Sequence, residues 1–136
     1  MITGLHHVQL AAPPGSEPRL RGFYSGALGL DEVPKPADLA RRGGVWFRGP
    51  GVELHLGIEE DFRPARKAHP GLLVDDLPGL VARLGEAGVD ARPDDLLPGF
   101  LRCYVDDPVG NRIELLEPLE SREPNGSGSG NVPYTS

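Results

Sequence analysis

Two histidines and two glutamates recur at matching positions in the two halves of this 136-residue sequence. His7 and His69 are 62 residues apart, and Glu53 and Glu114 are 61 residues apart. Each glutamate lies between two aliphatic residues, a few positions after a turn rich in Gly and Pro. Imidazole nitrogens and carboxylate oxygens without thiolates suit Zn²⁺, Mn²⁺, Ni²⁺, Co²⁺ or Fe²⁺. The pattern predicts one divalent-metal site that takes ligands from both halves of the chain.

Such a site predicts proton-transfer chemistry on a small substrate. A divalent ion that binds two neighbouring substrate oxygens polarises the carbonyl and stabilises an enediolate. A carboxylate beside the ion can then move a proton between adjacent carbons. With all four residues as ligands, either Glu53 or Glu114 could leave the metal and act as the base. The arrangement therefore predicts an isomerase, epimerase or lyase that acts on a substrate with vicinal oxygens.

His55 offers an alternative at the strand that carries Glu53. It lies two residues further along, on the same face of the predicted strand, and could replace Glu53 as ligand or act as an acid/base group. Without Glu53 the remaining ligands form a two-His-one-carboxylate triad, which suits Fe²⁺ and dioxygen chemistry on a catechol with His55 as the acid/base group. We expect Glu53 to be the ligand. His6 is expected to turn toward the helix side of its strand and to be structural.

Short strands and two helices must position these residues. Gly (19) and Pro (15) make up a quarter of the chain, and most of them lie between short apolar runs, as turn residues do. Apolar periodicity predicts strands and helices in the same order in both halves, so each half is a βαβββ module. The predicted strands and helices cover 5–12, 16–28, 30–34 and 45–58 in the first half, and 71–74, 76–87 and 100–116 in the second.

Strand alternation brings the four residues to one face. Side chains along a strand point alternately to opposite faces, and the aliphatic neighbours of each polar residue can pack on the helices. The two histidines and two glutamates are thereby left on the face turned away from the helices. If the two sheets curve around a common cleft, all four side chains converge there.

Four segments of the sequence resemble a known superfamily. LHHVQLAA, FYSGALGL, AHPGLLVDDL and DPVGNRIELLE are similar to signature segments of the vicinal oxygen chelate superfamily, which includes glyoxalase I, bleomycin-resistance proteins and extradiol dioxygenases. The resemblance covers roughly residues 5–117. It implies an α+β fold in which paired βαβββ modules form a curved mixed sheet around a metal-binding cleft.

The resemblance also implies roles for individual residues. The first-strand histidine of the superfamily matches His7, the second-module histidine matches His69, and the final-strand glutamate matches Glu114. The Glu or Gln ligand of glyoxalase and epimerase members matches Glu53. Four further strand residues are expected near a bound substrate: Trp46, Arg48, Arg102 and Tyr104.

The implied function is that of a metal-dependent enzyme of the glyoxalase type. A dioxygenase acting on a catechol is the first alternative, and metal-assisted addition of a thiol or water to an antibiotic would need the same ligands. A protein that sequesters a drug without catalysis is the remaining alternative, and the intact His/His/Glu set argues against it. Superfamily members commonly form homodimers, in some of which the chains exchange modules, so a homodimer is expected.

Length and composition indicate the domain organisation and argue against some classes of partner. We expect a single domain over 1–120, with modules at about 1–60 and 68–118, and a flexible tail rich in Gly and Ser over 121–136. A formal net charge of −6 argues against nucleic acid and anionic membranes as partners, which leaves a small-molecule substrate. Cys103 is the single cysteine, and no signal peptide or long apolar run is visible, so a cytoplasmic location is expected.

Overall fold

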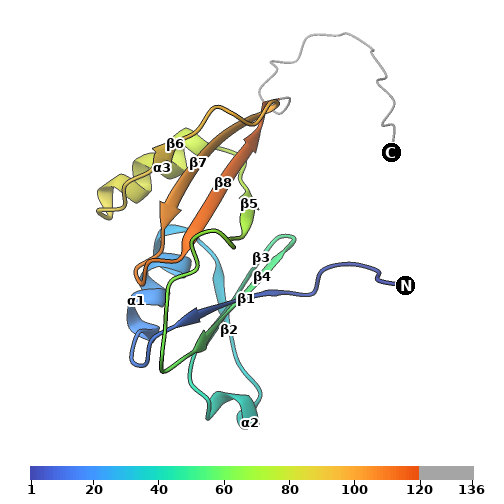
Figure 1. The fold of residues 1–136 in the computed structure, drawn as a ribbon, viewed down its shortest axis with the longest axis vertical. Helices are drawn as coiled ribbons and strands as arrows, with labels where there is room; N and C mark the ends of the chain where they lie inside the picture. Colours follow the sequence, from blue (N-terminus) through green and yellow to red (C-terminus); the bar gives the residue numbers. More distant parts are fainter. Residues whose placement is uncertain (120–136) are drawn as a thin grey trace.

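The computed structural model describes residues 1–119, and the predicted tail over 121–136 lies outside the described residues. The chain forms two modules, each built around a four-stranded sheet (Figure 1). Module 1 contains β1 (Val8–Ala12), α1 (Glu17–Arg21), the π-helical turn η1 (Gly22–Ala27), β2 (Asp31–Val33), α2 (Ala37–Ala40), β3 (Val45–Gly49) and β4 (Val52–Ile58). Module 2 contains β5 (Gly71–Leu73), α3 (Leu77–Glu86), β6 (Arg92–Pro93), β7 (Phe100–Asp106) and β8 (Arg112–Pro118).

The two sheets have the same topology. Their strand orders are β1-β4-β3-β2 and β5-β8-β7-β6. In each sheet the first strand pairs in parallel with the last, and the other neighbours are antiparallel. The predicted α+β fold built from paired βαβββ modules is confirmed. Within residues 1–119 the two sheets remain separate four-stranded sheets, and they do not close into a barrel.

The ends of some elements differ from the prediction. β1 begins at Val8, because its pairing with β4 starts there, and the preceding Leu5 is 81% exposed. His6 and His7 therefore precede the strand. The short helix α2 was not predicted, since its four residues contain no apolar stripe of useful length. The helix α3 is capped by the Asp76 side chain, which accepts a hydrogen bond from the Gly79 amide.

Each sheet has one face in the core and one open face. In β4 the buried side chains include Leu54 and Leu56, and in β8 they include Ile113 and Leu115. Cys103 on β7 is also buried, which raises the pKa of its thiol. The face opposite these residues, here called the open face, carries the polar residues of the candidate site. No helix within residues 1–119 is long and apolar enough to cross a bilayer.

A buried polar network connects the two modules. The Tyr24 hydroxyl of module 1 donates to Asp107 Oδ2 of module 2 at 2.7 Å. Asn111 donates from Nδ2 to the Ala11 carbonyl oxygen, and its Oδ1 accepts from the Ala65 amide, each at 2.9 Å. Asn111 and Tyr24 have no exposed surface. The turn between β7 and β8 is thereby fixed against β1 and the connection between the modules.

We expect Asn111→Ala to destabilise the protein by about 3 kcal/mol, because it leaves the half-buried Ala11 carbonyl and Ala65 amide without their partner and removes a fully buried side chain. Urea unfolding followed by far-ultraviolet circular dichroism measures this loss. Asp76→Ala, which removes an exposed helix cap, is the comparison variant and should cost about 1 kcal/mol. A loss for Asn111→Ala no larger than that of Asp76→Ala would contradict the structural role given to the network.

Candidate metal centre

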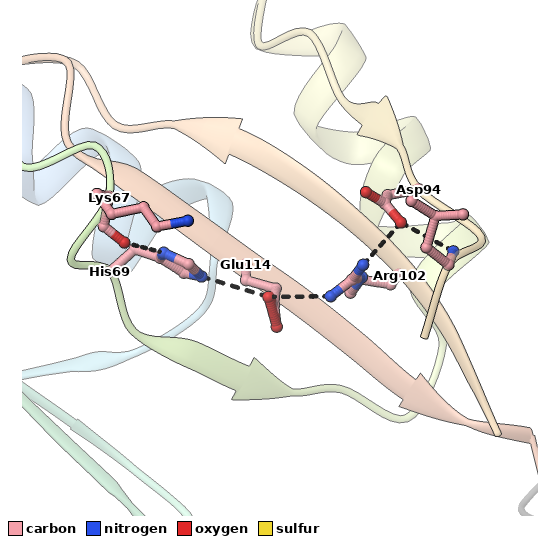
Figure 2. Close-up of polar contacts among 6 residues, drawn as sticks. Lys67, His69, Asp94, Arg102 and Glu114 are labelled. Atoms are coloured by element: carbon pink, nitrogen blue, oxygen red, sulfur yellow. Dashed lines mark hydrogen bonds and ion pairs between the residues drawn. The ribbon is translucent and has the colours of Figure 1, made fainter. Parts of the chain in front are cut away.

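Module 2 brings together two of the four predicted ligands. His69 Nε2 lies 3.3 Å from Glu114 Oε1, and the side chains are 22% and 13% exposed (Figure 2). The other ring nitrogen, Nδ1, lies 2.9 Å from the Lys67 carbonyl oxygen. A carbonyl oxygen only accepts, so Nδ1 carries a proton in this contact, and Nε2 is the ring nitrogen directed at the carboxylate.

His69 Nε2 and Glu114 Oε1 are both atoms that a divalent ion takes as ligands. Ligands about 2.1 Å from one divalent ion lie roughly 3.0–3.4 Å apart, which matches the separation of His69 Nε2 and Glu114 Oε1. The carbonyl contact at Nδ1 is the usual outer-shell arrangement for a metal-binding histidine. The donor chemistry of the pair therefore fits a divalent metal ion.

Module 1 holds the second group of candidate residues around a stack of three rings. The His55 ring lies between Trp46, with centroids 3.9 Å apart, and His7, with centroids 4.1 Å apart. His55 is 4% exposed, and its Nε2 has no hydrogen-bond partner among the described residues. Burial, followed by the nearby His7, lowers the pKa of His55, so its ring is neutral at pH 7.

Glu53 lies next to His55 and is engaged by an arginine. Its Oε2 is 3.6 Å from His55 Nε2, and its Oε1 accepts hydrogen bonds from Arg48 Nη2 at 2.6 Å and Nε at 2.9 Å. These hydrogen bonds are the main reason that the pKa of Glu53 is lowered. Glu53 is thus ionised at neutral pH, with one oxygen committed to Arg48 and the other directed toward His55.

His6 is part of this group, contrary to the expectation that it faces the helices. Its Nδ1 lies 2.9 Å from His7 Nδ1 and 3.6 Å from Glu53 Oε2, and its side chain is 83% exposed. The prediction was wrong because it extended strand alternation to residue 6, whereas β1 begins at Val8. The two adjacent histidines in the sequence were the signal that could have placed His6 in the same group as His7.

A cleft of about 740 Å³ lies between the modules. Its lining comes from both modules, namely residues 5–8, 48–54 and 70–73. His7 and Glu53 are in this lining, and His69 directly precedes it. Among residues 1–119, however, no three His, Cys, Asp or Glu side chains gather closely enough to hold a metal ion. One chain therefore presents two half-sites: His7, Glu53 and His55 in module 1, and His69 with Glu114 in module 2.

The predicted substrate-binding residues all lie beside the half-sites. Trp46 stacks on His55, and Arg48 binds Glu53. Arg102 Nη1 is 3.6 Å from Glu114 Oε1, and Tyr104 makes an edge contact with the His69 ring at 5.6 Å between centroids. Burial, followed by the Glu114 charge, raises the pKa of Tyr104. Figure 2 shows the polar chain from His69 through Glu114 and Arg102 to Asp94. The contact of these residues with substrate stays a prediction.

Solved structures of known proteins share this fold. A Bacillus anthracis protein described as a member of the glyoxalase family is 42% identical in sequence, with a TM-score of 0.84 over 87% of this chain and 97% of that chain. A mutant of the fosfomycin resistance protein FosX from Listeria monocytogenes, complexed with Mn(II) and 1S,2S-dihydroxypropylphosphonic acid, is 18% identical, with a TM-score of 0.73 over 90% and 98% of the two chains.

TnmS3, an antibiotic-binding protein from Streptomyces sp. CB03234, is 24% identical, with a TM-score of 0.64 over 87% of this chain and 99% of that chain. The likeness to FosX and to TnmS3 shows the fold alone. No protein family model matches the sequence, and no curated protein sequence matches it.

We expect Arg48→Gln to raise the pKa of Glu53 toward its ordinary value, because the variant removes the hydrogen bonds that favour the carboxylate. Carbon-13 NMR titration of the metal-free protein measures this pKa directly. Arg21→Gln removes the same charge from the distant pair of Arg21 with Glu32 and should leave the pKa of Glu53 unchanged. An unchanged pKa in Arg48→Gln would show that Arg48 does not control the ionisation of Glu53.

Proposed function

The chain belongs to the glyoxalase family within the vicinal oxygen chelate superfamily, and we propose that it is a divalent-metal-dependent enzyme of the glyoxalase type. Its substrate is a small molecule with two vicinal oxygens, on which it performs isomerase, epimerase or lyase chemistry. The observation that carries this proposal is the pair of His69 and Glu114, in which an imidazole nitrogen and a carboxylate oxygen, both ligand atoms for a divalent ion, lie 3.3 Å apart.

The proposed ligands are His7, Glu53, His69 and Glu114. This set supplies two imidazoles and two carboxylates, which suits Zn, Ni, Mn, Co or Fe(II). The Mn(II) held by FosX supports a divalent ion in this fold. When bound, the ion would polarise the two neighbouring substrate oxygens and make the intervening C–H bond more acidic.

The proposed role of Glu53 is to carry the proton. Its Oε2 takes a proton from one substrate carbon and returns it to the neighbouring carbon, so no other reactant is consumed. Arg48 holds the other oxygen, keeps the carboxylate ionised and orients it. His55 is neutral and buried, and it supports Glu53 from the side of Oε2. In this proposal Trp46, Arg102 and Tyr104 contact the rest of the substrate.

A second candidate function is an Fe(II)-dependent dioxygenase that acts on a catechol. Two observations favour it. The Nε2 atom of His55 has no hydrogen-bond partner among the described residues, and one carboxylate oxygen of Glu53 is already occupied by hydrogen bonds from Arg48. His7, His69 and Glu114 would then be the ligands, and His55 the acid/base group. If the protein bound no metal and took up an antibiotic in the cleft, it would instead function like TnmS3, which binds an antibiotic.

We propose that the active form is a homodimer that completes the site. Each chain supplies two half-sites, and neither has a full ligand set on its own. The edge strands β1 and β5 each pair on one side only within residues 1–119. Leu5 before β1 is 81% exposed and Leu73 on β5 is 73% exposed, and a second copy could cover both.

The unpaired thiol of Cys103 supports a reducing compartment such as the cytoplasm.

We expect the metal-loaded wild-type protein to retain about one ion per chain, measured by mass spectrometry of the metal after gel filtration. His69→Ala and Glu114→Ala should each weaken metal binding at least tenfold, as loss of a ligand does. Glu53→Ala should weaken it more than His55→Ala. If only the His55 variant weakens binding, His55 and not Glu53 is the fourth-strand ligand.

The same loaded protein is then assayed with adducts of 2-oxoaldehydes and thiols, with catechols and with fosfomycin. The proposal expects turnover of an adduct or of another substrate with vicinal oxygens, abolished by a chelator. Oxygen uptake with a catechol would instead establish the dioxygenase. Retention of less than about 0.2 ion per chain after loading with each metal would overturn the enzyme proposal.

A shared site predicts complementation between two inactive variants. We expect His7→Ala and His69→Ala each to bind metal poorly when pure. When the two are unfolded together and refolded as a mixture, a heterodimer contains one site with both substitutions and one site with neither. Metal retention should therefore recover to about one ion per heterodimer, which is half an ion per chain. No recovery in a verified heterodimer would show that each site is built within one chain.

A further inference from the structure

A column of stacked rings crosses the open face of module 1. The plane of the His55 ring lies at 6° to that of Trp46 and at 16° to that of His7. Trp46 and His55 are directly opposite each other on β3 and β4. His7, in contrast, precedes β1, and residues 1–7 are all exposed. The column therefore connects two rings that the sheet holds with one ring that lies outside the sheet.

The two histidines proposed as ligands are supported by different contacts. Nδ1 of His69 contacts the Lys67 carbonyl oxygen, which is a usual outer-shell partner of a metal-binding histidine. Nδ1 of His7 contacts Nδ1 of His6 instead, and the His6 side chain is 83% exposed. Exposed side chains change rotamer readily, so His6 gives the His7 ring little support. The other ring contact of His7 within residues 1–119 is its stack on His55.

The His55 ring is itself held in place. It is 4% exposed, and Trp46 covers the face turned away from His7. Lys35 places Nζ 5.8 Å over the Trp46 ring and donates a hydrogen bond to the Gly43 carbonyl oxygen. Lys35 follows β2, the neighbour of β3 on the side opposite β4. Neighbours from both sides of β3 therefore pack against the indole, and its edge is the part left for a substrate.

We infer that Trp46 and His55 are positioning residues, which set the orientation of the His7 ring through the stack. The inference rests on the proposed function, because it treats His7 as a metal ligand. A histidine nitrogen binds a metal ion through a lone pair that lies in the plane of the ring. A tilt of the ring turns this lone pair away from the ion, so packing that locks the ring also favours metal binding.

The flat ring of His55 and its nitrogen atoms serve different roles, which substitutions can separate. The stack needs the two faces of the ring, and both of them contact other rings. The alternative, in which His55 is itself a ligand, needs Nε2, which has no hydrogen-bond partner among the described residues. Phenylalanine has a flat ring without nitrogen atoms. His55→Phe therefore keeps the stack and removes the candidate ligand atom.

The test first follows the ring protons of His7 by NMR in the full chain without metal. Protons that lie against the face of an aromatic ring shift upfield, so the stack should give the His7 ring protons an upfield shift. His55→Ala should abolish this shift, and Trp46→Leu should reduce it, because leucine lacks the flat surface that supports His55. His55→Phe and Trp46→Phe should retain most of it. Val33→Ala trims the residue opposite Trp46 on β2 without removing a ring, and it should leave the shift unchanged.

The affinity for Zn²⁺ is then measured by competition with a chelating dye. His55→Ala and Trp46→Leu should each weaken Zn²⁺ binding about tenfold, as the loss of outer-shell support does. His55→Phe and Trp46→Phe should stay within about threefold of the wild type, because they preserve the shape of the ring. Val33→Ala should change the affinity less than about twofold. Amide spectra of each variant establish that it is folded.

The outcomes separate this inference from the proposed function. If folded His55→Ala and Trp46→Leu keep the wild-type shifts of the His7 ring protons, or bind Zn²⁺ like the wild type, the positioning role is overturned. If His55→Phe binds Zn²⁺ as poorly as His55→Ala, His55 is a ligand and the role given to its ring is overturned. If the variants change the shifts of His7 but the wild-type protein retains no divalent metal, the stack orients His7 and the metal-dependent function fails.

Discussion

The hydrogen bonds of Asn111 and Asp107 hold the two modules in one arrangement, and the position of one half-site relative to the other depends on them. Both residues lie in the turn that leads into β8, where Glu114 follows only three residues after Asn111. Their partners on the module 1 side are the Ala11 carbonyl oxygen, which accepts from Asn111, and the hydroxyl of Tyr24, which donates to Asp107. Burial raises the pKa of Tyr24 well above its ordinary value, so this hydroxyl stays protonated and donates to Asp107.

The same network fixes the segment that presents His69. The Ala65 amide donates to Asn111 Oδ1, and the Ala65 carbonyl oxygen accepts from the Arg112 amide. The connection between the modules is therefore bound to the start of β8 four residues before His69. One turn thus sets the positions of both members of the His69–Glu114 pair. A substitution that weakens the hydrogen bonds of this turn would therefore change the geometry of the site without replacing a candidate ligand.

Much of the fold could be predicted from the sequence, because alternation and turn residues are local signals. The repeat of aliphatic–Glu–aliphatic places Glu53 and Glu114 on open faces, and the structure has both there. Contacts between distant elements carry no such signal. The separation of the ligands into two half-sites, the contact of His6 with Glu53, and the stack of rings around His55 all depend on packing that one sequence does not display.

The two glutamates occupy equivalent positions in the repeat, but they have different neighbours, which explains how they can take different roles in the proposed function. The residue opposite Glu53 on the neighbouring strand is Arg48, and the residue opposite Glu114 is Tyr104. Arg48 donates two hydrogen bonds to Glu53 and lowers its pKa, which suits a positioned proton carrier. Glu114 instead directs an oxygen toward His69, as a metal ligand would. In the proposed function, a single cross-strand difference therefore distinguishes the ligand that also carries the proton, Glu53, from the ligand that only holds the metal, Glu114.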